Sequence, residues 1–229
     1  MEDSIYQRTE IVIGRENINK LKNSHVLVCG IGGVGSYALE AIARSGVGNI
    51  TIIDKDIVDV TNINRQLIAL ESTVGKDKVK VAQERLIDIH KEANIKAIKA
   101  NITSENINQI IKGDIDYVVD AVDNIEAKVA IITECSKKNI KCISCMGMGN
   151  KLNPLDIKVA DIYKTSTCPL AKCMRRKLKD AGIKKQKVVF STEIPVQKKV
   201  ETSTLGSVSF VPSVAGLIMA SEVIKDLLK

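Results

Sequence analysis

A chain of 229 residues, 45% of them hydrophobic and 27% charged, is long enough for one large α/β domain and has the composition of an ordinary soluble globular protein. No apolar stretch is long enough to cross a membrane, and residues 1–10 lack the features of a signal peptide, so we expect a cytoplasmic protein with no transmembrane segment. The net charge is +7, but aromatic residues make up only 3%, which excludes base stacking on an aromatic platform as the main way of holding a nucleic acid.

The most informative stretch of the chain is its first strand, turn, helix and strand. An apolar strand at 26–28 enters the turn Gly30-x-Gly32-Gly33-x-Gly35, a helical pattern follows, and a second strand at 50–53 ends on Asp54. Glycine is required in such a turn because a pyrophosphate reaches the backbone N–H groups and the helix N-terminus only where no Cβ intervenes. Asp54 stands where an acid accepts a hydrogen bond from a ribose hydroxyl. The unit therefore predicts a nucleotide site.

The rest of the first two thirds alternates between strands and helices. Residues 1–23 predict one or two short helices ahead of the first strand. The alternation up to about residue 145 predicts a Rossmann-like, doubly wound, mostly parallel sheet, in which ligands bind beyond the carboxyl ends of the strands. The elements expected after Asp54 are a helix opening at 75–79, a strand at 95–102, a helix at 105–113, a strand at 116–123, a helix at 125–138 and a strand at 140–146.

From residue 156 the pattern changes. Residues 157–163 and 187–195 predict antiparallel strands on either side of a basic segment, and 211–229 predict a final helix that packs against the core. We therefore expect one domain over 1–229, divided into an N-terminal helical segment (1–23), a nucleotide-binding core (24–155), a basic substrate-binding insertion (156–208) and a C-terminal helix (209–229).

The positive charge is concentrated in that insertion. Between Lys164 and Lys187 there are nine basic residues and one acid, Asp180, so this segment carries +8 and the rest of the chain is nearly neutral. Such a run is either a solvated helix face with a loop or a surface for a polyanionic partner.

Residues after the second strand favour a triphosphate over a dinucleotide. Asp56 leads into a segment containing Asn62 and Arg65, and Lys78 follows near the start of the next helix, which supplies fixed cations for extra anionic charge. Asp123, after an apolar strand, offers a hard oxygen ligand for Mg²⁺. Taken singly, Asn62 is also a turn former, Lys78 a solvated side chain, and Asp123 a cap for the helix beginning near Ile125.

Four motifs occur in order: GxGGVGS, NxNRQ, GKxK and xDxxDN. Together they resemble the adenylating superfamily of ubiquitin-activating, ThiF, MoeB and HesA enzymes, over residues 5–160 and 209–229. The resemblance implies that ATP lies over the glycine turn and that AMP is attached to a carboxylate. It implies the following roles: phosphate contacts from Gly30, Gly32, Gly33, Gly35, Asn62, Arg65 and Lys78, a ribose contact from Asp54 with Asp56 beside it, and Mg²⁺ held by Asp123.

The N-terminal Tyr6-Gln7-Arg8 resembles the family segment whose arginine reaches the γ-phosphate bound by the partner subunit. The resemblance therefore implies a homodimer in which Arg8 joins Arg65, Lys78 and Asp123 as a catalytic residue. Taken alone, Arg8 is also explained as a surface ion pair of little energetic weight.

Three further segments, 144–154, 168–183 and 188–195, resemble the branch of tRNA threonylcarbamoyladenosine dehydratases (the TcdA or CsdL type). That resemblance implies activation of the threonine-derived carboxylate beside the anticodon and its closure to the cyclic form, a reaction that needs no enzyme thiol. It assigns the tRNA backbone to basic residues of the insertion: Lys172, Arg175, Arg176, Lys177 and Lys179.

Two alternatives remain open at this point. One is an adenylyltransferase for a sulfur-carrier protein of the ThiS or MoaD kind, whose relatives often bind zinc through two CxxC pairs and work with a sulfur-relay partner. Here only Cys142-x-x-Cys145 occurs, and in a strand these two thiols face opposite sides, so we interpret the cysteines mainly as small core residues. The other alternative is an NAD-binding oxidoreductase or a regulatory nucleotide-binding module.

Overall fold

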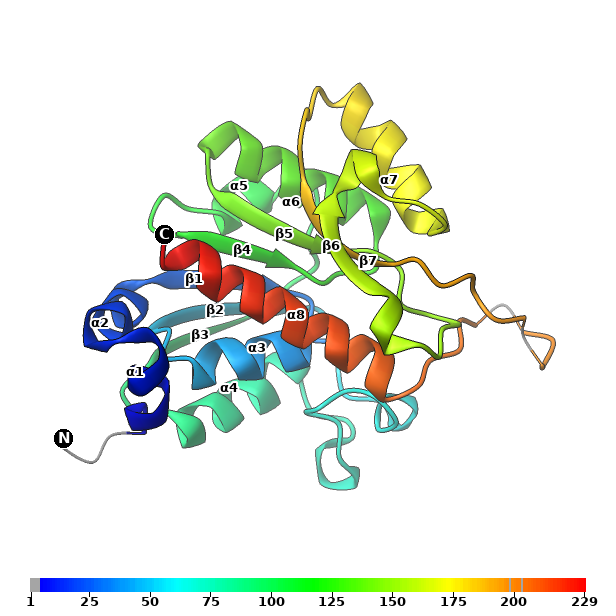
Figure 1. Ribbon diagram of the computed structural model, residues 1–229. Coiled ribbons are helices and arrows are strands. Elements are labelled where there is room, and N and C mark those ends of the chain that lie inside the picture. Colours follow the sequence, from blue (N-terminus) through cyan, green and yellow to red (C-terminus); the bar gives the residue numbers. More distant parts are fainter. Residues whose placement is uncertain (1–4, 198, 203) are drawn as a thin grey trace.

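The strands form one seven-stranded sheet in the computed structural model, which describes residues 5–197, 199–202 and 204–229 (Figure 1). The strand order is β3-β2-β1-β4-β5-β7-β6, and every neighbouring pair is parallel except β6 and β7. The strands are β1 (His25–Cys29), β2 (Asn49–Asp54), β3 (Asn94–Lys99), β4 (Tyr117–Asp120), β5 (Lys141–Cys145), β6 (Ile157–Asp161) and β7 (Lys187–Ser191). The predicted parallel sheet with an antiparallel C-terminal extension is confirmed.

Helices cover both faces of this sheet (Figure 1). One face carries α3 (Gly35–Arg44), α4 (Lys78–Ile89) and α8 (Phe210–Leu227), and the other carries α5 (Ile107–Ile110), α6 (Ile125–Lys138) and α7 (Pro169–Asp180). Ahead of β1 come α1 (Gln7–Ile13) and α2 (Arg15–Asn23), as predicted for 1–23, whose first four residues lie outside the described ranges. Short 3-10 turns lie at η1 (Val60–Asn62), η2 (Glu71–Thr73), η3 (Pro154–Asp156) and η4 (Ile162–Lys164).

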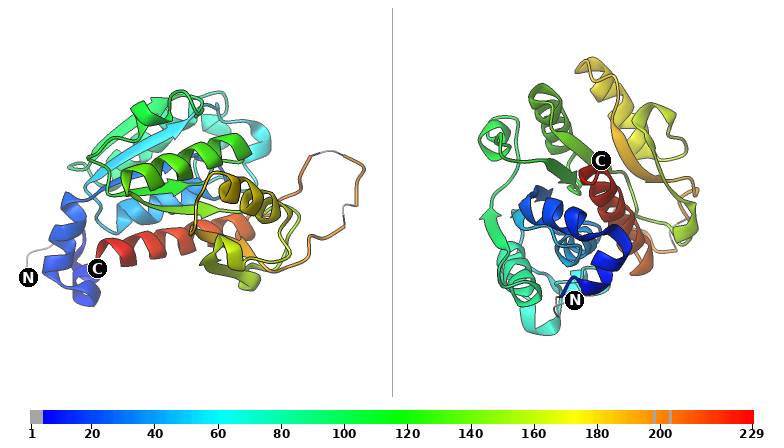
Figure 2. Two further views of the ribbon diagram at one scale, coloured as in Figure 1. Left: turned by 90° about the horizontal axis from the view of Figure 1, so that it is seen from above. Right: turned by 60° about the vertical axis from the view of Figure 1, so that its left-hand side comes forward.

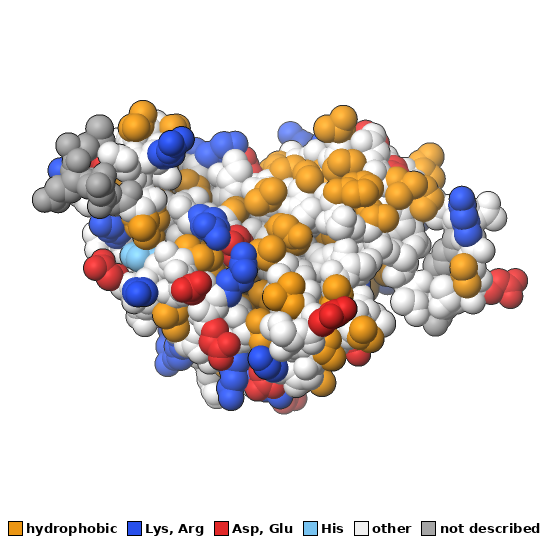
Figure 3. Space-filling model, turned by 90° about the horizontal axis from the view of Figure 1, so that it is seen from below, with side chains coloured by type: hydrophobic (Ala, Val, Ile, Leu, Met, Phe, Trp, Pro, Cys, Tyr) orange, Lys and Arg blue, Asp and Glu red, His pale blue; other side chains and the backbone are white. Residues whose placement is uncertain are grey.

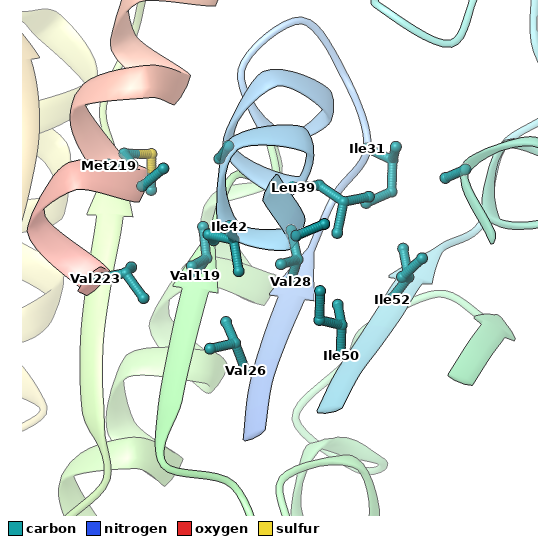
Figure 4. Packing of buried hydrophobic residues seen from close by; sticks show 14 of the residues in the cluster. Val26, Val28, Ile31, Leu39, Ile42, Ile50, Ile52, Val119, Met219 and Val223 are labelled. Carbon is teal, nitrogen blue, oxygen red and sulfur yellow. The ribbon is translucent and has the colours of Figure 1, made fainter. Parts of the chain in front are cut away.

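Successive strand residues feed two separate cores because side chains alternate across a sheet. In β1, Val26 and Val28 join the core under α3, α4 and α8, whereas Leu27 and Cys29 join the core under α5 and α6. Figure 4 shows the first of these cores, with strand residues facing helix residues: Val26, Val28, Ile50, Ile52 and Val119 lie opposite Leu39, Ile42, Met219 and Val223. Burial on both faces is why the central strands read as continuous apolar runs.

The final helix packs into the core, as predicted. Ala215 and Ala220 are buried, and a Cβ on Gly216 would stand 2.3 Å from the Val34 carbonyl oxygen, so glycine lets α8 cross α3 at close range. At the other end of α8, Asp226 accepts a hydrogen bond from the Tyr117 hydroxyl at 2.9 Å, which fastens the helix to β4. No helix in the described part of the chain has both the length and the apolar run that a membrane crossing requires.

Between β7 and α8 the chain makes an excursion. Residues 192–197 run outward from the end of β7, and 204–209 return to the start of α8 (Figure 2). The returning segment passes the carboxyl ends of the central strands, where it contributes to the site described next.

Candidate active site

A cleft of about 580 Å³ lies beyond the carboxyl ends of β1, β2, β4 and β5, at the point where the strand order reverses. Its volume is typical of sites for small molecules, roughly 300–1,000 Å³. Nine residues singled out from the sequence line it: Gly30, Gly32, Gly33, Asp54, Asp56, Asn62, Arg65, Lys78 and Asp123. The expectation that these side chains meet at one edge of the sheet is therefore confirmed, although the role of each remains a prediction.

The glycines of the turn serve different purposes. Gly30 has φ +86°, and a Cβ there would stand 2.8 Å from the Ala121 carbonyl oxygen. A Cβ on Gly35 would stand 1.8 Å from the Gly30 carbonyl oxygen, so Gly35 packs the helix start against the turn behind the cleft wall. At Gly32 a Cβ would meet no atom within 4 Å, which leaves the backbone open toward the cleft. This glycine cradle fits an approaching phosphate group.

Gly33 joins the turn to the last helix. A Cβ at this position would come within 3.2 Å of the Pro212 side chain and 3.3 Å of the Arg65 side chain. The N-terminal end of α8 and the segment after β2 thus both close on the turn, and glycine provides the room between them.

Asp54 stabilises the turn as well as facing the cleft. Its Oδ2 accepts a hydrogen bond from the Ile31 N–H at 2.6 Å, and its Oδ1 accepts one from the Asp56 N–H at 2.8 Å. A carboxylate has about four lone-pair positions, so the ribose contact predicted from the sequence is compatible with these two bonds.

Three side chains form a polar wall opposite the turn. Asn62 is buried and its Oδ1 accepts from the Asp59 N–H at 3.1 Å, which fixes η1. Arg65 donates from Nη1 to the Thr61 carbonyl at 2.8 Å, and Lys78, only 5% exposed, has its Nζ 3.4 Å from the Asp56 carboxylate. Two cations and an amide are thereby held in place before any anion binds.

Asp123 is exposed at the cleft, and its carboxylate has no hydrogen bond or ion pair with any residue in the described ranges. The alternative that it caps the helix beginning at Ile125 is wrong, because the neighbouring Asn124 accepts from the Ala127 N–H at 2.9 Å and is the cap. A short side-chain amide reaches that N–H, which leaves Asp123 free. Within the described residues no three His, Cys, Asp or Glu side chains cluster as a metal cage. One carboxylate beside an anion site fits Mg²⁺, which takes few protein ligands.

Beneath the cleft lies a buried ion pair that the sequence reasoning missed. Lys128 donates from Nζ to Asp120 at 3.0 Å and to the Cys145 carbonyl at 2.7 Å, and Ser144 also donates to Asp120. Asp120 belongs to the xDxxDN motif, but the signal for Lys128 was only a charged residue on the buried side of a helical pattern. The pair ties the end of β4 to the end of β5, just before Met146–Gly149 of the cleft wall.

A backbone strap across the cleft was also missed. Asn150, at φ +55°, accepts from the Gly206 N–H at 2.7 Å and donates its own N–H to the Gly206 carbonyl at 2.8 Å. On the other side Asn64 donates to the Ser207 carbonyl at 3.0 Å. Residues 205–207 therefore bridge two walls of the cleft, and Asn64, first interpreted as a turn former, is one of the two ties.

Arg8 lies outside this cleft. It is exposed on α1, which stands at the end of the sheet away from the glycine turn (Figure 1). The Tyr6 hydroxyl is 2.7 Å from His90 Nδ1, which attaches the start of α1 to the end of α4. Action of Arg8 on a partner subunit remains a prediction.

The basic residues predicted to hold tRNA divide into two groups on α7. Lys172, Arg176 and Lys179 are exposed and share one helix face. Arg175 instead donates to the Thr165 carbonyl at 3.0 Å, and Lys177 pairs with Glu126 at 2.8 Å. Because Leu170 of the first turn of α7 lines the cleft, the exposed face begins near the cleft and extends away from it.

The six cysteines are unpaired. Cys145 packs in the core under α8, whereas Cys142 packs against the cores under α5, α6 and α7, so the two face opposite sides as predicted. Burial raises the pKa of Cys145 to about 12 and that of Cys29 well above its usual value. Such thiols are protonated at neutral pH and are poor nucleophiles.

Comparison with known proteins matches the ThiF family over residues 6–229. The chain belongs to the ThiF family. It is 47% identical over 240 residues to a tRNA threonylcarbamoyladenosine dehydratase of Bacillus subtilis, covering 98% of this chain and 94% of that protein. It is 39% identical over 193 residues to the Escherichia coli protein of that name, covering 81% and 72%.

Solved structures of the ThiF family agree with the fold. The E. coli enzyme TcdA in complex with AMP superposes with a TM-score of 0.92 at 35% identity, covering 96% of this chain and 92% of that one. Its complex with ATP gives a TM-score of 0.91. The resemblance predicted from four motifs, including the dehydratase branch, is confirmed by these relatives.

Proposed function

We propose that this protein is an ATP-dependent tRNA threonylcarbamoyladenosine dehydratase. The observation that carries the proposal is 47% identity, over nearly the whole of both chains, to a relative with that name. The adenylyltransferases that act in molybdopterin synthesis are more distant, for example 34% identical over 55% of this chain. The proposed reaction needs no sulfur donor, so we include no sulfur-relay partner.

The chemistry follows from the poor reactivity of a carboxylate. The threonine-derived carboxylate attacks the α-phosphate of ATP, pyrophosphate leaves, and the acyl-adenylate then loses AMP when the neighbouring carbamoyl group attacks its carbonyl carbon. The second step is intramolecular and therefore has a high effective concentration. The net change in the nucleoside is the loss of one water.

We assign the nucleotide to the cleft. The open backbone at Gly32 receives phosphate oxygens, Asp54 receives the ribose, and the polar wall of Asn62, Arg65 and Lys78 balances the negative charge. These groups are fixed before the reaction, so they stabilise charge without reorganising. Mg²⁺, held by Asp123, would neutralise phosphate charge and orient the leaving pyrophosphate.

We assign the tRNA backbone to the exposed face of α7, formed by Lys172, Arg176 and Lys179. A tRNA substrate places the enzyme in the cytoplasm. The homodimer implied by Arg8 is supported by hydrophobic side chains gathered on the underside of the molecule (Figure 3). Exposed hydrophobic residues near α8 include Val60, Ile63, Leu155, Phe210 and Leu217. Contiguous apolar surface of this kind is typical of protein interfaces.

The decisive experiment incubates the protein with ATP, Mg²⁺ and tRNA carrying threonylcarbamoyladenosine, followed by mass spectrometry of the nucleoside digest. We expect the modified nucleoside to lose the mass of one water, with one AMP and one pyrophosphate released per event. An unchanged nucleoside would contradict the proposal. AMP attached to a Gly-Gly carrier protein, or NAD binding without pyrophosphate release, would instead support the alternatives left open by the sequence.

A further inference from the structure

Gln66 is a buried polar residue of the cleft whose side chain has no role in the fold. Its side chain lines the cleft, only 6% of the residue is exposed, and its carbonyl oxygen Oε1 is fully enclosed. Within the described ranges, Oε1 has no hydrogen-bond partner. The amide nitrogen Nε2 also makes no hydrogen bond to a described residue, but it is not enclosed, so the NH₂ group is the end presented to the cleft.

The neighbouring polar side chains of the cleft do not share this property. Asn62 bonds the Asp59 N–H, Lys78 lies against Asp56, and Asp54 holds two N–H groups of the turn. An enclosed carbonyl without a partner is unfavourable to folding, and an apolar side chain of the same size would avoid this penalty. The folded chain alone therefore gives no reason for a carboxamide at position 66.

The position of Gln66 indicates which ligand group it meets. The Gln66 N–H donates to the Asn62 carbonyl at 2.9 Å, a helical bond that puts the two side chains on one side of the segment. The next residue, Leu67, donates its N–H to Ser36 Oγ at 3.2 Å, in the first turn of α3. Gln66 thus stands between the polar wall and the helix that follows the glycine turn, where an anionic group would bind.

We propose that Gln66 is a direct ligand of the bound nucleotide and donates a hydrogen bond from Nε2 to a phosphate oxygen. The proposal rests on the proposed function only in that the cleft binds ATP. A carboxamide donor adds direction to the wall without a further positive charge, so it positions the phosphate chain where Arg65 and Lys78 mainly neutralise it.

The test measures ATP affinity and thermal unfolding of Gln66→Met, an apolar side chain of similar length. We expect ATP to bind about tenfold more weakly or worse, because a hydrogen bond to a charged group is lost. The melting temperature of the nucleotide-free variant should equal or exceed that of the wild type, because the enclosed carbonyl is removed. ATP affinity within about twofold of the wild type would overturn the proposal, since a lost charged hydrogen bond has a larger effect.

The matched control is Thr133→Val. Thr133 Oγ1, on α6 and outside the cleft lining, is the other enclosed side-chain atom without a partner in the described part of the chain. Its removal should equally preserve or raise the melting temperature but leave ATP affinity unchanged. A loss of ATP affinity in this control would show that Gln66→Met acts through general repacking and would overturn the proposal.

A second variant covers failure of the first to fold. Gln66→Glu keeps the size of the side chain but repels phosphate, so ATP should be weakened more than AMP, which carries fewer phosphates. Equal affinities in Gln66→Glu and the wild type would overturn the proposal. All of these measurements omit tRNA: normal ATP binding by a wild type that leaves tRNA unchanged would contradict the proposed function alone.

Discussion

Replacing Lys128 by methionine would leave the Asp120 carboxylate buried without its cation. The two side chains are 1% and 0% exposed, and Nζ also donates to the Cys145 carbonyl at 2.7 Å. Removing one partner of a buried pair costs roughly 3–5 kcal/mol, because the remaining charge can neither reach water nor find another partner. Ser144 and the Val122 N–H still bond Asp120, so we expect the lower half of that range.

The assay is urea unfolding at neutral pH, followed by circular dichroism, with Lys137→Met as the control. Lys137 is exposed on the same helix, and its substitution should change the free energy of unfolding by less than about 0.5 kcal/mol. A double-mutant cycle with Asp120→Asn should show a loss smaller than the sum of the two single losses, because the uncharged amide no longer needs the cation. A loss below about 1 kcal/mol in Lys128→Met would refute the reasoning, since an ordinary surface pair has that value.

Three further outcomes are expected. Arg65→Ala and Asp123→Ala should each abolish pyrophosphate release while the far-UV spectrum stays unchanged; normal turnover in either would contradict its assigned role. Alanine at the exposed basic residues of α7 (Lys172, Arg176 and Lys179) should weaken tRNA binding and flatten its salt dependence without affecting ATP affinity, whereas Lys177→Ala, which removes a residue paired with Glu126, should do much less. Burial alone would raise the pKa of Asp226, but hydrogen bonds from Lys187, Lys229 and Tyr117 outweigh it and lower the pKa to about 2, so this stabilisation is present above about pH 4 and is lost as the pH falls toward 2. The stability difference between wild type and Asp226→Asn should therefore be about 2 kcal/mol near neutral pH and shrink across that window, and a difference independent of pH would contradict it.

The sequence predicted the sheet and the edge that carries the cleft because these depend on local signals. A glycine turn, an acid at the end of a strand and alternating apolar segments each fix structure within about thirty residues, the span of one βαβ unit. Asp54, Arg65 and Lys78 consequently lie where the motifs placed them.

What the sequence did not predict are contacts between distant segments. The bond from Asn64 to the Ser207 carbonyl joins residues 143 positions apart, and no periodicity announces such a partner. The basic run shows the same limit from the other direction: Arg175 and Arg176 are neighbours, yet only the helix orientation decides that one holds Thr165 and the other faces solvent.

The glycine turn is complete early in the chain, but Pro212, which closes against Gly33, and the strap at 205–207 come from its last tenth or so. During synthesis from the N-terminus, a nascent chain can form β1, β2 and the turn long before these residues leave the ribosome. Its nucleotide cleft then lacks a wall. ATP affinity is thereby a property of the finished polypeptide, and a chain released before α8 would neither bind nor hydrolyse the nucleotide.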